Sequence, residues 1–447
     1  MMPDALLMAA HFARTRWLLD FRQREALERW QQQRLQQFFT HVLPRAARFR
    51  GLQPTTLDDL PYMDKATLMA DFQAYNTRGV ALETVLPIAL QAETSRDFSP
   101  VYDGLTVGLS SGTSGNRGVF LVSKAERLRW AGILLARTLP PHLLKHLLSP
   151  WHAPLRIAFF LRANSNLYTT LNSRRIQFTF HDLLRGVEAA VPQLNANPPD
   201  VLVAPPPVLR ALAAEALAGR LRIQPSHIIA VAEVLESRDA DSVHSAFGRI
   251  PHQIYQATEG FLAYTCEHGS LHLNESFVQV ERAWLDAEHT RFQPVITDFT
   301  RDTQLIVRYR LNDVLRVRAE PCPCGRAEHS IAAIEGRADE VLWLPAHNGK
   351  AVAVFPDFIR RAMLLVGEQI REFAVQQRGM TLHIGLLLED DSSQVQQAVA
   401  TRLADLWQEL GVQVPTLHFT DWQVPTLGAK RRRVQMLSAP EGLLCTF

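Results

Sequence analysis

The sequence predicts an α/β protein with a large N-terminal domain of layered sheets and helices and a small α+β C-terminal domain. With 447 residues, the chain is longer than one ordinary hydrophobic core accommodates. Segments typical of strands alternate with helical ones from Leu105 to about Leu344. The turn-rich stretch LWLPAHNGKAV follows, and the remaining residues again mix helices and strands. We therefore expect one domain over residues 1–338 and a second over residues 339–447.

A helical lead-in is expected over residues 1–75. Between Trp17 and about Arg50, apolar residues recur at helical spacing, as in REALERWQQQRLQQFFTHVL, and predict one or two amphipathic helices. Such helices could bind a membrane surface or pack on the rest of the protein. The mixed charge of their polar face favours packing.

The α/β alternation that follows can be traced segment by segment. The runs RIAFFL, HIIAVAEVLE and LIVRYRL contain strand-like stretches of apolar residues, and VLVAPPPVLRALAAEALAG alternates strand-like with helical character. In the last part, FPDFIRRAMLLVG and VQQAVATRLADLWQEL have helical periodicity, and REFAVQQ and TLHIGLLLE are typical of strands. The small domain is therefore expected to be α+β.

Bulk composition excludes several classes of protein. Hydrophobic residues make up 47% and charged residues 21%, as in a water-soluble globular protein. Lys and Arg (47) nearly balance Asp and Glu (45), so the net charge of +2 indicates neither a nucleic-acid partner nor an anionic membrane. The sequence leaves the oligomeric state open, and a homodimer is one option because two-fold dimers are the commonest assemblies.

Targeting and redox signals point to the cytoplasm. Arg14, Arg16 and Asp20 interrupt the first apolar patch too early for a signal-peptide core. No uncharged apolar run reaches the roughly 18 residues that span a bilayer. The cysteines, Cys266, Cys322, Cys324 and Cys445, are too few for a disulfide scaffold in a chain of this length.

The segment Gly108–Gly118 consists almost wholly of small residues and lies between two strand-like runs, in VGLSSGTSGNRGVFLVS. Such a loop can turn backbone N–H groups and hydroxyls toward one anion, most often a phosphate. It is not a P-loop, because the Gly-Lys-[Ser/Thr] ending and the following helix are missing. Its Gly-x-Ser-x-Gly match would make Ser110 a hydrolase nucleophile, but that elbow also requires a helix next. A plain hairpin connection is the remaining alternative.

Four later motifs carry side chains suited to a nucleotide. YQATEG, from Tyr255 to Gly260, offers a ring for adenine and a carboxylate for Mg²⁺. VRYRLNDV places Asp313 after a strand, where it can accept hydrogen bonds from a ribose diol. EGRADEVLWL provides Arg337 and Asp339 at the expected domain boundary, and LGAKRRRVQML presents Lys430 near the C-terminus. Alone, each motif is weak, and AKRRRV could instead be a basic patch for an acidic partner.

The order of these motifs resembles the adenylate-forming superfamily of acyl-CoA synthetases, peptide-synthetase adenylation domains and luciferases. Within it, the chain is most similar to the phenylacetate–CoA ligase branch, including related synthetases that adenylate a deazaflavin cofactor. That likeness rests on LERWQQQRLQQFFTHVLPRAARFRG, LDDLPYMDKATL, ITDFTRDTQLIVRYRLNDV, CPCGR and KRRRV. It covers nearly the whole chain.

The resemblance implies ATP-dependent activation of a carboxylic acid through an acyl-adenylate with release of pyrophosphate. A thiol, usually that of coenzyme A, then takes the acyl group. Other acceptors stay open, namely an amine, a hydroxyl or a carrier-protein thiol, as does a degenerate member that binds nucleotide without turnover. The implied ligands are therefore a small-molecule carboxylic acid, ATP, Mg²⁺ and coenzyme A.

The resemblance also implies roles for individual residues. Thr258 contacts the α-phosphate, Glu259 binds Mg²⁺, and Lys430 acts from the mobile small domain on the charge that develops in the transition state. Asp339 stands where the hinge of that domain is expected. The loop residues that wrap the β- and γ-phosphates are Ser110, Ser111, Gly112, Thr113, Ser114, Gly115 and Arg117. The other nucleotide-binding residues are Glu233, Tyr255, Gln256, Asp313 and Arg337.

Several positions depart from the family pattern. The loop lacks the usual Pro and has Arg117 where Lys is common, which replaces a point charge by a planar fork. The ribose motif has Asn312 before Asp313 instead of Gly, and Ala257 precedes Thr258. The acyl pocket is expected between the phosphate loop, Ala232–Leu235 and Tyr255–Gly260, with walls from Phe159 to Leu167. The sequence does not identify the acid.

A structural zinc site is expected from Cys266, His268, Cys322 and Cys324. Three sulfurs and an imidazole are the ligand set of a closed tetrahedral Zn²⁺ site. The Cys-x-Cys spacing is narrower than the common Cys-x₂-Cys, so reduced buried cysteines are the alternative. Ligases of the resembling branch carry a Cys/His metal cluster at corresponding places, which favours zinc.

Overall fold

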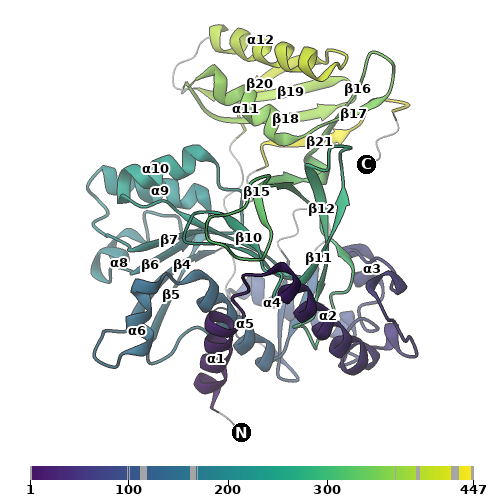
Figure 1. Cartoon of the computed structure of the whole chain (residues 1–447). Coiled ribbons are helices and arrows are strands. Elements are labelled where there is room, and N and C mark those ends of the chain that lie inside the picture. Colours follow the sequence, from purple (N-terminus) through teal and green to yellow (C-terminus); the bar gives the residue numbers. More distant parts are fainter. Residues whose placement is uncertain are drawn as a thin grey trace. The chain divides into compact units, whose positions relative to one another are not determined.

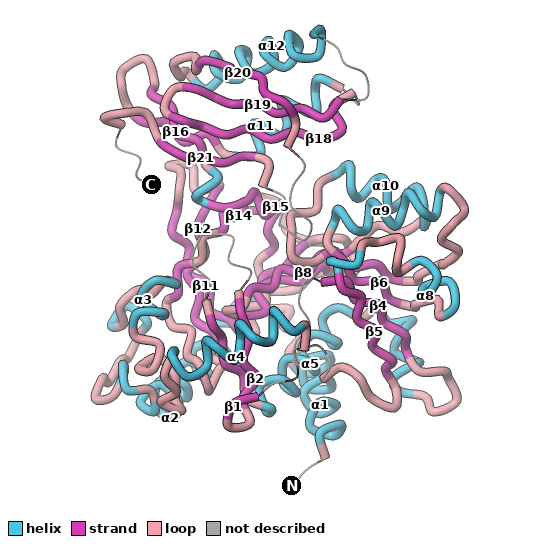
Figure 2. The backbone as a smooth tube through the Cα atoms, turned by 180° about the vertical axis from the view of Figure 1, so that it is seen from behind, coloured by secondary structure: helices cyan, strands magenta, loops and turns pink. Residues whose placement is uncertain are grey.

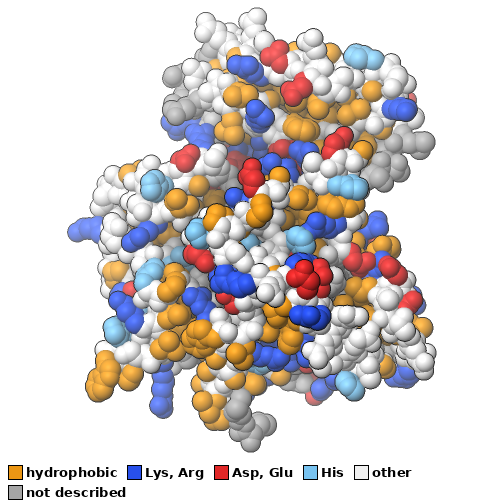
Figure 3. Space-filling view, viewed as in Figure 1, with side chains coloured by type: hydrophobic (Ala, Val, Ile, Leu, Met, Phe, Trp, Pro, Cys, Tyr) orange, Lys and Arg blue, Asp and Glu red, His pale blue; other side chains and the backbone are white. Residues whose placement is uncertain are grey.

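In the computed structural model, the polypeptide divides into two units, each described here by itself. Unit 1 comprises Met1–Glu281, Val295–Leu311 and Arg318–Ala332, and unit 2 comprises Arg282–Pro294, Asn312–Val317 and Ala333–Phe447. The structure describes residues 3–97, 99, 101–110, 118–161, 168, 170–367, 369–388, 393–423 and 432–443. Figure 1 shows the order of the elements along the chain. Acidic and basic side chains are interspersed on the face seen in Figure 3, in keeping with the small net charge of +2.

The lead-in of unit 1 is helical, as its periodicity predicts. It contains α1 (Asp4–Ala13), a π-helical turn (Arg14–Leu18), α2 (Arg24–His41), α3 (Lys65–Ala70) and α4 (Leu82–Ser95). Helix α2 buries Leu27, Phe38 and Phe39. Its Trp30 Nε1 donates to the Ser276 carbonyl (2.8 Å), and Gln31 Nε2 donates to that of Glu275 (3.0 Å). Helix α2 therefore packs on the rest of unit 1, as its mixed charge favoured.

A parallel sheet forms the centre of unit 1 (Figure 2). Its order is β5 (Ile176–Asp182), β4 (Leu155–Leu161), β6 (Val201–Ala204), β7 (His227–Ala230) and β8 (His252–Ala257). All residues of β6 and β7 are buried, because apolar side chains pack on both faces. One face packs with α8 (Val191–Ala196), α9 (Pro206–Leu217) and α10 (Ser237–Phe247), and the other with α5 (Lys124–Thr138) and α6 (Leu144–Leu148).

Antiparallel strands extend this sheet beyond β8. They are β9 (Gly260–Thr265), β10 (Leu271–Leu273) and the first residues of β15 (Ser330–Arg337). A separate small sheet contains β1 (Val101–Tyr102), β2 (Leu105–Leu109) and β3 (Val119–Val122). It packs through Val107 and Leu121 against Phe72 and the α4 residue Val85. Strands β2 and β3 form an antiparallel hairpin in which Leu109 pairs with Val119. This hairpin flanks the small-residue loop.

Unit 2 is an α+β structure, as predicted for the C-terminal part. Its four-stranded sheet has the order β20 (Thr416–Asp421), β19 (Thr381–Leu388), β18 (Ile370–Arg378) and β21 (Val434–Ser438). Helices α11 (Pro356–Val366) and α12 (Ser393–Leu410) cover it, and the Trp407 side chain is fully buried in the core. A hairpin of β16 (Leu342–Pro345) and β17 (Ala351–Val354) precedes the sheet. The observed architecture confirms the α/β prediction for the chain.

Three further strands lie between β10 and β15 along the chain. They are β11 (Val278–Trp284), β12 (Arg291–Asp298) and β14 (Asp313–Val317), and the short β13 (Tyr309–Arg310) pairs with β12. Within unit 2, Arg291 of β12 pairs with Arg316 of β14. Among the described residues, every helix is too short or too polar to cross a membrane.

The contact between α1 and α5 depends on Gly132. A Cβ atom at this position would lie 2.6 Å from the Met8 carbonyl oxygen and 2.9 Å from the Phe12 nitrogen. Because these are backbone atoms of α1, the helix would have to move. We expect Gly132→Ala to lower the free energy of unfolding by about 1–3 kcal/mol and to expose α1 to proteolysis. Chemical denaturation and limited trypsin digestion measure both effects. Thr138→Ala, which removes a hydroxyl bonded within α5, is the matched control.

Candidate functional site

The small-residue loop is closed at its base by two hydrogen bonds. Ser110 N donates to the Gly118 carbonyl (2.7 Å), and Gly118 N donates to Ser110 Oγ (2.8 Å). Strand β3 begins at Val119, directly after the loop. The described chain after the loop continues as a strand, and the Ser110 hydroxyl accepts a backbone hydrogen bond. The remaining predicted phosphate ligands lie outside the described residues: Ser111, Gly112, Thr113, Ser114, Gly115 and Arg117.

A lysine that the sequence analysis missed lies beside this base. The Lys65 Cε atom is 3.0 Å from the position of a Cβ atom built on Gly118, and Ser110 Oγ is 3.3 Å from it. Lys65 is the first residue of α3, and Asp64 caps that helix by accepting from Thr67 N (2.8 Å). The helix start therefore places the Lys65 side chain against Gly118 at the base of the loop, although Lys65 is distant from it in sequence.

The predicted Tyr-x-x-Thr-Glu motif forms the connection between β8 and β9. Tyr255 and Gln256 belong to β8, and Gln256 Oε1 accepts from Trp130 Nε1 (3.3 Å). Thr258 Oγ1 donates to Glu259 Oε2 (2.8 Å), so the hydroxyl and the carboxylate lie together in the turn. A Cβ atom at Gly260 would lie 3.1 Å from Asp298 Oδ2. Glycine at this position lets a second carboxylate approach the turn closely.

Glu233 follows the neighbouring parallel strand. It comes three residues after β7 ends at Ala230, and its N–H donates to the Val231 carbonyl (2.9 Å). Between them, Ala232 has a φ of +68°, a left-handed conformation that residues with a Cβ rarely adopt. The Glu233 and Tyr255–Glu259 segments thus follow the carboxyl ends of adjacent parallel strands, the usual ligand-binding edge of such a sheet.

The segment 298–304 connects the turn after β8 with the hairpin that flanks the loop. Asp298 Oδ1 accepts from Thr300 N (2.8 Å) and Thr300 Oγ1 (2.6 Å), which fixes the carboxylate next to Gly260. At the other end of the segment, Gln304 Oε1 accepts from Leu121 N of β3 (3.1 Å). One short stretch of chain is therefore hydrogen-bonded to the strand after the loop and lies against the turn after β8.

A buried glutamate fixes the middle of that stretch. Glu126 Oε1 accepts from Asp302 N (2.8 Å) and Thr303 N (3.0 Å), while Oε2 accepts from Ser123 N (2.7 Å). The Ser123 hydroxyl in turn caps α5. Burial opposes ionisation of Glu126, but Arg301 and these hydrogen bonds outweigh it and lower its pKa. Burial raises the pKa of Asp298.

The remaining predicted residues belong to unit 2. Asp313 begins β14, and Arg337 ends β15. Asp339 Oδ1 accepts from Asn312 Nδ2 (2.8 Å), and Asp339 Oδ2 pairs with Arg432 Nη2 (2.5 Å). Lys430 lies outside the described residues. The expected hinge residue thus contacts both the neighbour of Asp313 and a residue two positions after Lys430.

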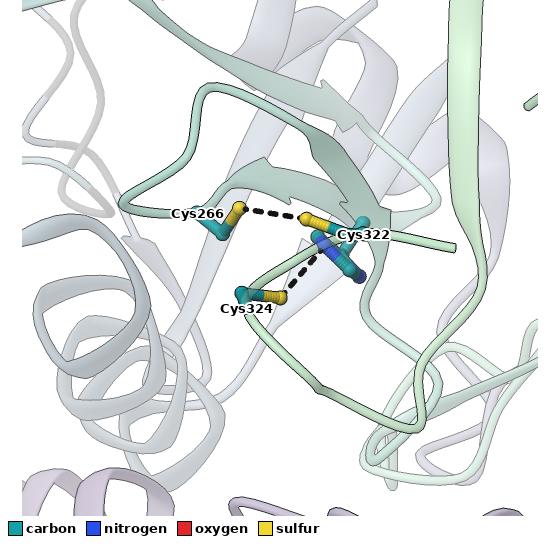
Figure 4. Close-up of side chains that lie close together, drawn as sticks. Cys266, Cys322 and Cys324 are labelled. Atoms are coloured by element: carbon teal, nitrogen blue, oxygen red, sulfur yellow. Dashed lines mark hydrogen bonds between the residues drawn. The ribbon is translucent and has the colours of Figure 1, made fainter. Parts of the chain in front are cut away.

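Three cysteines and one histidine form a cluster in unit 1 (Figure 4). Cys266 Sγ lies 3.6 Å from Cys322 Sγ, and Cys324 Sγ lies 3.3 Å from His272 Nε2. All four ligand atoms are within 4.8 Å of one another. Tetrahedral Zn²⁺ with Zn–S bonds of about 2.3 Å separates its sulfurs by about 3.7 Å. The donor set and its spacing therefore fit a structural zinc ion.

The histidine in this cluster is His272, which corrects the expectation of His268. Cys266 is buried where β9 ends, whereas His268 is exposed in the turn between β9 and β10. His272 is buried in β10, and its Nδ1 donates to the Glu328 carbonyl (2.8 Å). That hydrogen bond places the proton on Nδ1 and leaves Nε2 free to bind a metal. Cys445 lies outside the described residues.

The surroundings favour thiolate at Cys322 only, since burial raises the pKa of Cys266 to about 11 and also raises that of Cys324. Burial raises the pKa of the Cys322 thiol, but hydrogen bonds involving Ser270, Cys324 and His272 outweigh it and lower the pKa to about 6. The segment 322–327, here called the cysteine loop, also binds the helical lead-in. Arg22 Nη1 donates to the Cys324 carbonyl, and Ala327 N donates to the Phe21 carbonyl (2.9 Å). A metal bound here would therefore fix both the β9–β10 hairpin and the segment before α2.

Comparison with known proteins identifies the fold. The chain matches no family model and no curated protein. It is similar to 2-hydroxyisobutyryl-CoA ligase in the postadenylation state with 2-HIB-AMP, with 17% identity and a TM-score of 0.58 over 91% of this chain and 88% of that one. An open conformation of that ligase with 2-HIB-AMP and CoA has 16% identity and a TM-score of 0.57, over 91% of this chain and 90% of that one.

A second similar structure is the amide bond synthetase McbA from Marinactinospora thermotolerans. It has 12% identity and a TM-score of 0.52, over 74% of this chain and 67% of that one. At such identities the similarity establishes the fold. The chain thus has the fold of these ligases, which is the fold that its resemblance to adenylate-forming enzymes implied.

Proposed function

We propose that the protein activates a carboxylic acid with ATP through an acyl-adenylate, releases pyrophosphate and transfers the acyl group to coenzyme A. The observation that carries this proposal is the arrangement of the two phosphate-binding motifs. The strand after the small-residue loop is hydrogen-bonded to segment 298–304, and the Thr258–Glu259 turn lies against the same segment. The ligase with a similar fold holds an acyl-AMP and CoA, which supports the same chemistry here.

In this proposal, each motif acts on a different part of ATP. The loop that begins at Ser110 surrounds the β- and γ-phosphates, and Lys65 adds positive charge at its base. The Thr258 hydroxyl binds the α-phosphate. Glu259 would hold Mg²⁺, an ion that neutralises phosphate charge when it is bound. Asp313 and Arg337 bind the ribose, with Tyr255 near the adenine.

The second half of the proposal concerns the acyl acceptor. We favour coenzyme A, and product analysis by mass spectrometry with coenzyme A, an amine and a carrier protein distinguishes the alternatives. The amide bond synthetase of similar fold makes the amine a necessary control. The phenylacetate–CoA ligase-like specificity is part of this proposal.

Lys430 is proposed to stabilise the charge that develops during adenylation. Removing one such donor costs roughly a hundredfold to a thousandfold in rate. We therefore expect Lys430→Ala to reduce ATP–pyrophosphate exchange by about that factor across a panel of aryl and fatty acids. Lys65→Ala is expected to raise the KM for ATP by about tenfold through loss of one charged contact. Lys350→Ala, on the exposed turn between β16 and β17, is the control.

Exchange that is unchanged in Lys430→Ala would contradict the role of this lysine. Absence of exchange with every acid, together with no ATP binding by calorimetry, would contradict the proposed function itself.

Asp339 is proposed as the hinge about which residues 339–447 rotate between the two half-reactions. We expect Asp339→Pro to leave pyrophosphate exchange nearly intact and to slow thioester formation by about tenfold or more. Asp339→Asn keeps the backbone free to rotate and removes the ion pair with Arg432. A rapid-quench assay that finds both half-reactions equally slow in Asp339→Pro would argue against a hinge here.

The Cys/His cluster is proposed to hold a structural Zn²⁺ ion through Cys266, His272, Cys322 and Cys324. Protein purified without chelator is expected to contain about one zinc ion per chain by elemental analysis. His272→Ala should lose the metal and lower the unfolding temperature by about 5 °C or more. His268→Ala should keep the zinc ion and the unfolding temperature of the parent protein, since the His268 side chain is exposed. Zinc lost from His268→Ala and retained in His272→Ala would refute the assignment.

A further inference from the structure

A surface of unit 1 combines exposed apolar side chains with cations. Its apolar members are Leu148, Trp151 and Ile250, which are 60%, 92% and 71% exposed. Lys145 and Arg249 are exposed close in sequence to Leu148 and Ile250, and exposed Arg174 precedes Arg175, which bonds the backbone around Trp151. We call the three apolar residues together with Lys145, Arg174 and Arg249 the Trp151 patch. In the space-filling view, hydrophobic and basic side chains lie together at the lower left, where Figure 1 shows α6 (Figure 3).

Trp151 is presented by an ordered turn. His152 N donates to the Ser149 carbonyl (3.4 Å), and Pro150 restricts the backbone between them. Arg175 Nη2 donates to the carbonyls of Ser149 (2.5 Å) and His152 (2.8 Å). The backbone on both sides of the indole is therefore fixed, although the ring itself is almost fully exposed.

Electrostatics on this surface differ from those of the whole chain. Residues 139–156, 171–178 and 248–254 contain no Asp or Glu, whereas the chain has 45 acidic residues among 447. Arg249 carries its charge near His142, two residues before α6: burial first, and then the charges of Arg249 and Lys145, lower the pKa of His142. At the border, Arg156 pairs with Asp200 (3.0 Å). The net charge of +2 therefore conceals a local excess of positive charge.

We propose that the Trp151 patch binds unit 1 to an anionic lipid surface. Tryptophan favours the boundary between headgroups and acyl chains, where its ring is buried and its N–H stays hydrated. Lys and Arg reach lipid phosphates while their stems cover apolar surface. A two-fold pairing of the patch with a second copy would bring like charges together. Nucleic acid would leave Leu148 and Ile250 without apolar partners. This inference does not depend on the proposed enzymatic function.

The test is flotation of the full chain with vesicles of phosphatidylcholine alone or with 30% phosphatidylglycerol. We expect binding to the anionic vesicles and little binding to the neutral ones, and a decrease with added salt. Each basic residue near an anionic surface contributes about fivefold to partitioning. Lys145→Glu/Arg249→Glu should therefore weaken binding by at least about twentyfold. Trp151→Ser should weaken binding to the anionic vesicles both without and with added salt, because the contribution of the indole ring is apolar.

Matched controls come from the same chain. Trp17→Ser removes another exposed tryptophan, which is 56% exposed on the turn after α1, and is the control for Trp151→Ser. Lys350→Glu reverses an exposed charge elsewhere and is the control for the charge reversals. Both should bind vesicles like the parent protein, and all variants should keep its unfolding temperature. The proposal is overturned by equal binding to neutral and anionic vesicles, by no binding, or by equal losses in the controls. Self-association or RNA binding that requires Trp151, without vesicle binding, would also overturn it.

Discussion

The buried carboxylate of Glu126 is the interaction on which much of the site in unit 1 depends. It accepts hydrogen bonds from three backbone N–H groups, two of which belong to the segment 298–304. Each of these donors would cost about 1–3 kcal/mol if it were left buried without a partner. The same glutamate completes the cap of α5, so one side chain positions a helix start and a loop distant in sequence.

From this contact the geometry extends in two directions. Gln304 binds the β3 backbone and so holds the hairpin that flanks the small-residue loop. Asp298 reaches Gly260 and so lies against the turn that carries Thr258 and Glu259. A rigid connection between the proposed phosphate loop and the carboxylate proposed to bind Mg²⁺ suits a reaction in which both must contact one triphosphate at the same time. The Cys/His cluster serves unit 1 differently, since it links the β9–β10 hairpin, the cysteine loop and the lead-in.

Local composition matters more for partners than the totals do. The net charge of +2 gave no reason to expect a membrane partner, but it describes only the sum over all residues. The Trp151 patch shows a different balance, because folding gathers three segments that all lack acidic residues. An exposed indole on a fixed turn adds an apolar contribution that net charge does not report.

The sequence alone predicted the fold class and the likeness to adenylate-forming enzymes, because ordered motifs and strand–helix alternation are local properties of the chain. It also identified the three clustered cysteines. The tertiary structure decided the rest, since Glu126, Gln304 and Lys65 act through residues far away in sequence. The S-x-x-E pattern from Ser123 to Glu126 signals a helix cap, but it does not reveal that Glu126 also binds the backbone of segment 298–304. His272 replaced His268 for a similar reason: hairpin register buries one imidazole in β10 and exposes the other in the turn, and spacing does not encode that choice.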